Sequence, residues 1–162
     1  MNYDLIIIGA GPGGYICAIR ASQLGQKVAI VDKEWLGGVC LNVGCIPSKS
    51  LLKNAEVAHT LRHRGDELGF SFDNLQLDYS IAVKRSRQVA QRLTKGVAFL
   101  MKKNDTDVYI GSARLTSNSS VEITDSDGAV RNLTANNIVL ATGSHPAVPA
   151  ALSPNGDNVL TY

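Results

Sequence analysis

The feature that most constrains the fold is a short apolar run that leads directly into the glycine-rich stretch GAGPGG. Residues 4–8 (DLIII) are typical of a parallel strand that is buried on both faces. Residues 12–25 have a helical pattern in which Gly25 stands where a helix would end, and residues 27–31 (KVAIV) form a second apolar run. Because parallel strands need a long crossover between them, this segment predicts a β-α-β unit.

The glycine turn of this unit has the spacing G-x-G-x-x-G, with Gly9, Gly11 and Gly14. In this setting the first glycine permits a tight turn, the second lets the backbone approach a pyrophosphate, and the third lets helix and strand pack closely. Asp32 follows the second strand, where a carboxylate can accept hydrogen bonds from an adenosine ribose. The pattern favours a dinucleotide site over a turn without a ligand, but it does not separate NAD from FAD.

The stretch GVCLNVGCIPSK, residues 38–49, contains two of the three cysteines, Cys40 and Cys45. A structural zinc ion needs four ligands and an iron–sulfur cluster needs further cysteines at short spacing, so no metal site is predicted. Glycines around the pair indicate close approach of a ligand, which disfavours two inert buried thiols and favours a redox pair. Cys17 stands alone in a helical pattern and is interpreted as a small buried hydrophobe.

A disulfide between Cys40 and Cys45 makes a demand on the backbone. Cα atoms five positions apart in a regular α-helix are about 8.6 Å apart, whereas a disulfide tolerates at most about 7 Å. If the pair is bonded, residues 41–44 must therefore depart from a regular helix. Pro47 is well placed to start the helix that follows. Within that helix, Lys49 has two open interpretations: a solvated lysine, or a cation beside an electron-accepting cofactor.

Two further helices are predicted, from about residue 47 to residue 64 and over residues 80–103. The second has an apolar stripe, with basic side chains mainly off it, and we interpret its basic side as a solvated face rather than a surface for an acidic partner. The stripe consists of Ile81, Val89, Leu93, Val97 and Leu100, and the basic residues are Lys84, Arg85, Arg92, Lys95, Lys102 and Lys103.

After the long helix, the sequence changes to short runs typical of strands, separated by residues typical of turns. Residues 108–110, 120–124 and 129–133 predict an antiparallel β-meander over about residues 106–134, rather than another β-α-β unit. Residues 137–141 (NIVLA) return to the pattern of a buried strand. The expected fold class is α/β: a Rossmann-like domain with a parallel sheet, flanking helices and an inserted antiparallel β-meander.

Charge and hydropathy disfavour some classes of partner and some cellular locations. The 162 residues include 16 basic and 14 acidic ones, a balance that does not favour nucleic acid or an anionic membrane as the partner. The apolar runs are far too short to span a membrane, and the N-terminus lacks the pattern of a signal peptide. We therefore expect a cytoplasmic protein, and in a reducing cytoplasm a close cysteine pair is more often catalytic or metal-binding than structural.

Four stretches together resemble one family. IIIGAGPGGY, GVCLNVGCIPSK, LTKGVAFLMKKN and IVLATGS resemble the N-terminal part of dihydrolipoamide dehydrogenases, which are FAD-dependent pyridine nucleotide–disulfide oxidoreductases. The resemblance covers essentially the whole chain. Ser48 distinguishes the motif from that of glutathione reductases, which usually have a second lysine there, whereas mercuric reductases share much of it. A non-catalytic dinucleotide-binding module is the alternative from another class.

The resemblance implies an FAD site and a path for electrons. Cys40 would be the interchange thiol that reacts with the substrate, and Cys45 the thiol beside the flavin, with Lys49 near the reactive edge of the flavin. Dihydrolipoamide would reduce the Cys40–Cys45 disulfide, and the electrons would pass through FAD to NAD⁺. The family usually has glutamate where this chain has Asp32. The residues implied in FAD binding are Gly9, Gly11, Gly14, Asp32, Lys33, Gly38, Val39, Cys40, Lys49, Ala113, Thr142, Gly143 and Ser144.

The resemblance also implies a division of the chain and a set of partners. Residues 1–150 would be the N-terminal portion of the FAD-binding domain, and residues 151–162 a connector towards an NAD-binding domain outside this sequence. We expect a fragment of a longer enzyme that does not turn over alone, because the family's catalytic His–Glu pair lies in a C-terminal domain. The expected partners are lipoyl domains of 2-oxo acid dehydrogenase or related complexes and, in the full-length protein, a second subunit of a homodimer. Neither nucleic acid nor membrane is expected.

Overall fold

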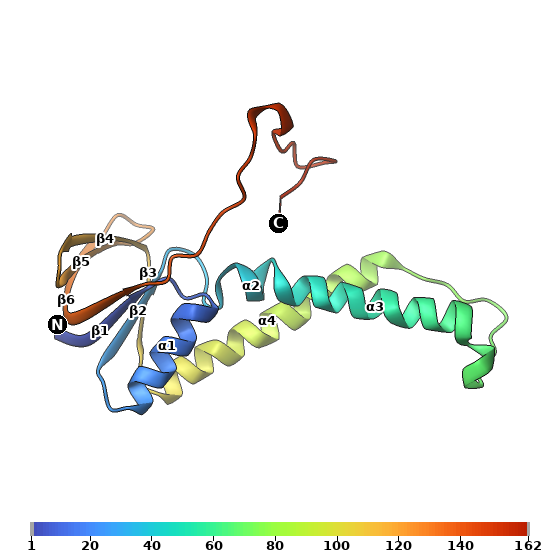
Figure 1. Ribbon diagram of the computed structural model, residues 1–162, viewed down its shortest axis with the longest axis horizontal. Coiled ribbons are helices and arrows are strands. Elements are labelled where there is room, and N and C mark those ends of the chain that lie inside the picture. Colours follow the sequence, from blue (N-terminus) through green and yellow to red (C-terminus); the bar gives the residue numbers. More distant parts are fainter. Residues whose placement is uncertain (1, 162) are drawn as a thin grey trace.

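A β-sheet occupies one end of the molecule, and two long helices extend from it as an arm (Figure 1). The computed structural model describes residues 2–161. Along the chain the elements are β1 (Asn2–Ile8), α1 (Pro12–Gln23), β2 (Val28–Asp32), α2 (Gly38–Asn42), α3 (Cys45–Arg64), η1 (Asp66–Leu68), α4 (Tyr79–Lys103), β3 (Asp107–Ile110), β4 (Ser112–Ser117), β5 (Ser120–Thr124), β6 (Val130–Leu140) and η2 (Ala150–Leu152).

The predicted β-α-β unit forms the centre of the sheet, whose strand order is β3-β2-β1-β6-β5-β4. β1 pairs in parallel with both β2 and β6. Side chains alternate between the two faces of a strand. Leu5 and Ile7 accordingly pack towards α1 and α4, whereas Ile6 and Ile8 pack against β5 and β6. The central strands are thus buried on both faces, as their unbroken apolar runs predict.

The strands after α4 differ from the prediction in their pairing. Residues 108–110, expected in the antiparallel meander, belong to β3, which pairs in parallel with β2. The reason is that α4 carries the chain back along the sheet, so that β3 enters in the same direction as β2. The meander itself consists of β4, β5 and the first part of β6. β4 was not predicted, because most of its side chains are exposed and show no apolar alternation.

The two strands predicted at residues 129–133 and 137–141 are one strand, β6. Its first part pairs antiparallel with β5, and from Thr134 onwards it pairs in parallel with β1. One strand therefore joins the meander to the parallel part of the sheet. The expected α/β architecture, with a parallel sheet, flanking helices and an antiparallel meander, is confirmed.

The buried face of α4 differs from the predicted stripe. Of the five predicted residues only Val97 is buried, whereas Ile81 and Leu93 are exposed. Most residues on the buried face of α4 are small. They allow α3 and α4 to approach closely, and the larger side chains remain outside this contact. The buried residues of α4 are Ala82, Ser86, Ala90, Val97 and Met101. The six basic residues noted in the sequence are all exposed, in agreement with a solvated face.

A buried tyrosine joins β1 to β3. The Tyr3 hydroxyl donates a hydrogen bond to Asp107 Oδ2 at 2.8 Å and lies 2.7 Å from the Tyr109 hydroxyl. Burial, reinforced by these hydrogen bonds, raises the pKa of Tyr3 far above its ordinary value. The network lies at the Asn2 end of β1, away from the loops that follow the strands.

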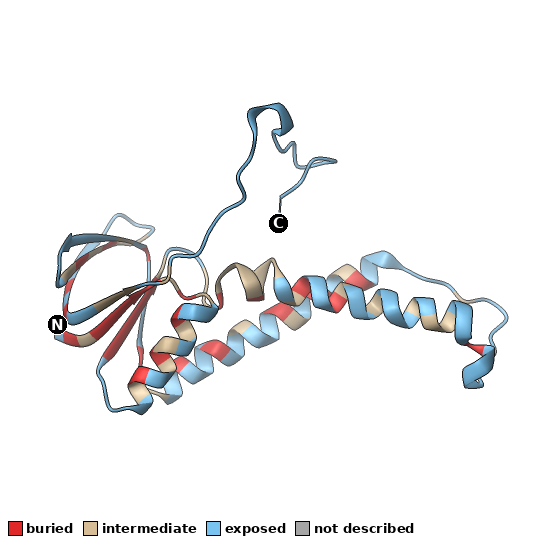
Figure 2. Cartoon of the chain, viewed as in Figure 1, coloured by how far each residue is buried: buried red, intermediate tan, exposed pale blue. Residues whose placement is uncertain are grey.

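After β6 the chain runs away from the sheet as an exposed segment that contains only the short helix η2 among the described residues (Figure 2). The division between a domain ending at residue 150 and a connector from residue 151 stays a prediction.

Candidate functional site

The loops that follow β1, β2 and β6 surround a cleft of about 680 Å³. β1 lies between β2 and β6, so the chain leaves it towards one neighbour and returns on the other side. Such a switch point leaves a crevice at the carboxyl ends of the strands, where α/β proteins bind ligands. The cleft is lined by Gly11 and Pro12, residues 32–35, residues 38–40 with Gly44 and Cys45, and residues 141–146.

The glycine turn has the close contacts that its spacing predicts. A side chain at Gly9 would overlap the carbonyl group of Ala141, and one at Gly14 would overlap the carbonyl group of Gly9. Gly11 is the N-cap of α1, and no side chain caps the helix at this end. The first N–H groups of α1 and its positive dipole end are therefore available to an anion at the edge of the cleft.

Asp32 holds two loops of the cleft together. Its Oδ2 accepts a hydrogen bond from Ala10 N at 2.7 Å, and its Oδ1 accepts hydrogen bonds from Glu34 N at 2.9 Å and Trp35 N at 3.1 Å. A carboxylate offers about four lone-pair sites, so one more hydrogen bond can be accepted on the side of the cleft. That Asp32 contacts a ribose stays a prediction. Its hydrogen bonds with backbone N–H groups were not predicted.

Lys33 and His145 meet across the cleft entrance. Lys33 follows β2 and His145 follows β6, and their Nζ and Nε2 atoms are 3.3 Å apart. Lys33 was expected at the cofactor site, whereas His145 was placed only in a loop. The two loops are 112 positions apart in sequence, so no local pattern could have paired them.

The redox motif packs directly against the glycine turn. Gly37 N donates a hydrogen bond to the Ala10 carbonyl at 2.8 Å. Gly38 has a φ of +57°, and a Cβ added there would lie 2.6 Å from the Cα of Gly11. Only a residue without a side chain permits both this conformation and this contact. The cysteines and the predicted phosphate-binding turn therefore share one wall of the cleft.

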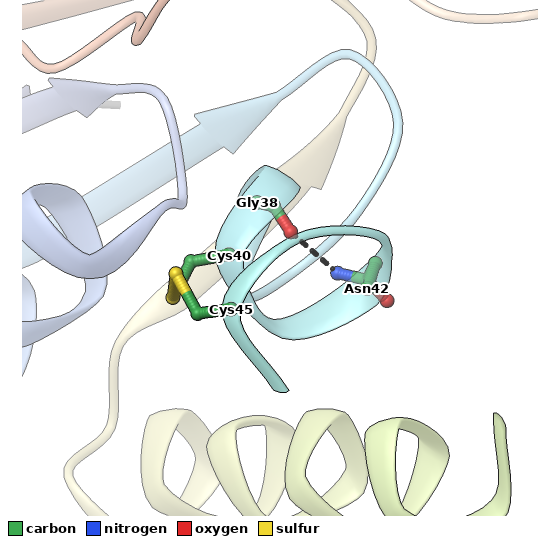
Figure 3. The surroundings of a disulfide bond; sticks show 4 residues. All are labelled: Gly38, Cys40, Asn42 and Cys45. Atoms are coloured by element: carbon green, nitrogen blue, oxygen red, sulfur yellow. Dashed lines mark hydrogen bonds between the residues drawn. A yellow bond between two sulfur atoms is a disulfide. The ribbon is translucent and has the colours of Figure 1, made fainter. Parts of the chain in front are cut away.

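A break between α2 and α3 brings the two cysteines together (Figure 3). Cys40 lies in α2, Cys45 is the first residue of α3, and they are joined by a disulfide with a Cα–Cα distance of 4.6 Å. Between the helices, Val43 has φ −134° and ψ −9°, and Gly44 has φ −111° and ψ −102°. The prediction that a bonded pair requires a departure from regular helix within residues 41–44 is confirmed. Cys45 is exposed and Cys40 is half-buried.

The remaining predicted site residues lie at three places. Thr142, Gly143 and Ser144 follow β6 and line the cleft. Ala113, on β4, lines a second cavity of about 200 Å³ that shares Asp32, Lys33 and Thr142 with the surroundings of the cleft. Lys49 lies one turn beyond Cys45 on α3, exposed and outside the residues that line the cleft.

Seven lining residues were not predicted as site residues: Pro12, Glu34, Trp35, Gly44, Ala141, His145 and Pro146. Trp35 had a signal in the sequence, since the single tryptophan of the chain comes three residues after the acid that ends the second strand. Pro12, Gly44 and Ala141 each adjoin a predicted site residue in the sequence. Glu34, His145 and Pro146 are ordinary loop residues, and only the approach of the loops after β2 and β6 brings them to the cleft.

The described residues show neither a metal centre nor a membrane span. Among residues 2–161 no group of three or more His, Cys, Asp or Glu side chains could hold a metal ion. The rings of His59 and His63 contact each other on α3 at a tilt of 41°, with centroids 4.5 Å apart. No helix in the same part of the chain is long and apolar enough to cross a membrane.

Comparisons with known proteins agree with this geometry. The family model described as pyridine nucleotide-disulphide oxidoreductase matches residues 3–161. Dihydrolipoyl dehydrogenase of Chlorobaculum tepidum is 48% identical over 160 residues, which cover 99% of this chain and 34% of the relative. Dihydrolipoyl dehydrogenase of Corynebacterium glutamicum is 48% identical over 143 residues, which cover 88% of this chain and 30% of the relative.

A solved structure extends the comparison to the fold. The crystal structure of LpdA from Mycobacterium tuberculosis superimposes with a TM-score of 0.88 at 23% identity, over 96% of this chain and 35% of that chain. At this identity the likeness concerns the fold alone. The chain spans about a third of the length of the curated relatives it matches.

Proposed function

The chain belongs to the pyridine nucleotide–disulphide oxidoreductase family, and we propose that it is the FAD-binding and redox-disulfide part of a dihydrolipoyl dehydrogenase. The observation that carries this proposal is the position of the Cys40–Cys45 disulfide in the wall of the cleft that the glycine turn also lines. Relatives with that name, 45–48% identical over 160 residues, support it.

The residues around the cleft fit FAD. The close contacts at Gly9 and Gly38 and the uncapped start of α1 suit a pyrophosphate. Asp32 and Lys33 would hold the adenosine ribose, and Ala113 the adenine end in the smaller cavity. When bound, FAD supplies a two-electron acceptor that can deliver a hydride to NAD⁺, which would occupy another domain. The further residues that we assign to FAD are Gly11, Gly14, Val39, Cys40, Lys49, Thr142, Gly143 and Ser144.

The cysteines would carry the exchange with the substrate. One thiolate of dihydrolipoamide attacks the sulfur of Cys40, forming a mixed disulfide and releasing Cys45 as a thiolate. The second substrate thiol then closes the lipoamide disulfide and releases Cys40, so that two electrons pass to the protein. Cys45 is the first residue of α3, whose positive end favours a thiolate there. We assign Cys45 to the flavin side and place Lys49 near the flavin edge.

The whole protein would act on lipoyl domains of a 2-oxo acid dehydrogenase or related complex, as a cytoplasmic homodimer. We expect residues 2–161 not to turn over lipoamide by themselves. In the enzymes that the chain resembles, the NAD site and the catalytic His–Glu pair belong to other domains.

The spectrum of the purified full-length protein tests this proposal. We expect FAD to bind, giving a yellow protein, and mild reduction to produce a long-wavelength band from the Cys45 thiolate beside the flavin. Cys45→Ser should abolish the band. Cys40→Ser should give the band without reduction, because Cys45 is then always a free thiol. Cys17→Ser, outside the cleft, should change nothing.

Two results would contradict the proposal. If FAD binds but no band appears on reduction, Cys45 is not the thiol beside the flavin. If full-length protein reduces Hg(II) with a pyridine nucleotide but does not turn over lipoamide, the chain belongs to a mercuric reductase instead.

A further inference from the structure

The short helix that carries Cys40 cannot hold its position by itself. α2 has only five residues, too few to be stable without tertiary contacts. Its position nevertheless decides whether the two sulfurs can bond. The Cα–Cα distance of 4.6 Å lies near the short end of the range found in disulfides. Two thiols that are not bonded must lie farther apart than two bonded sulfurs, so contacts that hold α2 against α3 favour the disulfide over the dithiol.

Asn42, the last residue of α2, ties this helix to the residues before it and to α4, which packs against both α2 and α3. Its Nδ2 donates hydrogen bonds to the carbonyl groups of Leu36 and Gly38, both at 2.9 Å. Figure 3 shows the bond to Gly38, which closes the turn that contains Cys40. The Asn42 amide therefore links the two ends of the segment that presents Cys40 to Cys45.

α4 holds Asn42 from the other side. Thr94 Oγ1 donates a hydrogen bond to Asn42 Oδ1 at 3.2 Å, and Arg87 donates one to the Asn42 carbonyl at 3.1 Å. One and two turns after Thr94, the side chains of Val97 and Met101 are buried in the core against the sheet. Thr94 thus connects the Cys40 turn to a helix that the core fixes in place. Neither Thr94 nor Asn42 lines the cleft.

We propose that Thr94 is a positioning residue which, through Asn42, sets the thiol–disulfide equilibrium of Cys40 and Cys45. This inference deepens the proposed function, on which it rests. The step concerned is the reduction of the Cys40–Cys45 disulfide by a dithiol: the S–S bond opens, two electrons and two protons arrive at the two sulfurs, and the dithiol becomes a cyclic disulfide.

Thr94→Val tests the proposal, because valine keeps the branched shape and removes the hydroxyl donor. The purified protein is equilibrated in buffers of reduced and oxidised dithiothreitol, quenched with acid and alkylated, and its Cys40 and Cys45 thiols are counted by mass spectrometry. We expect the equilibrium to shift about 3- to 10-fold towards the dithiol, the range that follows from losing one hydrogen bond. Thr94→Ser, which keeps the donor, should stay within about 2-fold of the native protein on the same grounds.

A control variant and a double variant separate positioning from general destabilisation. Ser86, also on α4, donates its hydroxyl to the Val83 carbonyl of its own helix at 2.7 Å and bonds to no other element among residues 2–161. Ser86→Ala should therefore lower the melting temperature without moving the thiol equilibrium. Asn42→Ala should shift the equilibrium as Thr94→Val does, and adding Thr94→Val to Asn42→Ala should have no further effect.

Three results would overturn the proposal. They are an unchanged equilibrium in Thr94→Val, an equal shift in Ser86→Ala, and a further shift when Thr94→Val is added to Asn42→Ala. Should Thr94→Val not fold, Thr94→Ala removes the same donor and places a better helix former in α4. The test needs no flavin. A native pair that cannot be titrated reversibly overturns the proposed function as well, whereas a native pair that titrates normally beside an unchanged Thr94→Val overturns only this inference.

Discussion

At the scale of single residues, the site depends on places where two backbones touch. The redox motif reaches the glycine turn through Gly38, whose Cα faces that of Gly11. A Cβ at this position would meet backbone atoms, which cannot move aside as a flexible side chain can. The contact joins the cysteines to the predicted phosphate site, so its loss should affect both.

Replacing Gly38 by alanine should weaken FAD binding by about tenfold or more and destabilise the protein, through steric overlap and the strain of a positive φ. Isothermal titration with FAD and urea unfolding measure the two effects. Gly96→Ala is the matched control. Gly96 lies in α4, and a Cβ added there would meet nothing within 4 Å beyond its chain neighbours and the backbone of its own helix, so its replacement should stabilise the protein by about 0.5–1 kcal/mol. Equal behaviour of the two variants would show that the Gly38 contact is not needed.

Residue types alone predicted part of this site. The spacing of the glycines predicted the turn, and the separation of Cys40 and Cys45 predicted a backbone break, because both arguments depend only on local geometry. The hydrogen bond from Ala10 N to Asp32 and the meeting of Lys33 with His145 were not predictable. They arise from loops that follow different strands.

At the scale of elements, α4 shows how packing selects a face that hydrophobicity alone does not identify. The buried residues in the first half of α4 are small ones such as Ala82 and Ser86, while Ile81 remains exposed. The extent of the helix was predicted from its period, to within one residue at its start. The choice of buried face was not, since it depends on how closely α3 approaches.

The start of α4 gives a prediction about pH. Asp78 caps the helix by accepting hydrogen bonds from Ser80 N at 2.8 Å and from the Ser80 hydroxyl, and these bonds lower the pKa of Asp78 below its ordinary value. A carboxyl group with a lowered pKa adds stability that is present above its unfolded pKa and is lost as the pH falls through its folded pKa.

Asp78→Ala should therefore lower the melting temperature at pH 7, and the difference from the native protein should shrink as the pH falls below the ordinary aspartate pKa of about 4 and through the lowered pKa of Asp78. Differential scanning calorimetry between pH 2.5 and pH 7 measures it. Asp73→Ala, at an exposed aspartate of the preceding loop, serves as the comparison. A difference that stays constant over this range would argue against the cap.

At the scale of the whole molecule, burial is uneven. The sheet has an apolar cluster on each face, whereas the arm formed by α3 and α4 is mostly exposed towards its tip (Figure 2). In α3 only Pro47 and Ser50 are buried, both near its start. Segments with few buried contacts open more easily than a core, so the local stability should fall along the arm.

Native-state hydrogen exchange should show this gradient. We expect backbone amides of residues 57–64 to exchange at least about tenfold faster than those of β1 and β2, since they open without global unfolding. Amides of α4 around Val97, which packs in the core, should exchange slowly and provide an internal reference. Uniform exchange across the arm and the sheet would mean that the molecule opens only as a whole.

The sequence by itself determined the β-α-β unit, the glycine turn and the condition on the cysteine pair, because each depends on contacts between residues close in the chain. Only the tertiary structure decided that β3 pairs in parallel with β2, that β6 belongs to both parts of the sheet, and that Asn42 is held by Thr94. These features join segments separated by tens of residues. Their pairing is selected by burial of the two faces of the sheet and by the path of α4, quantities that no local pattern in the chain contains.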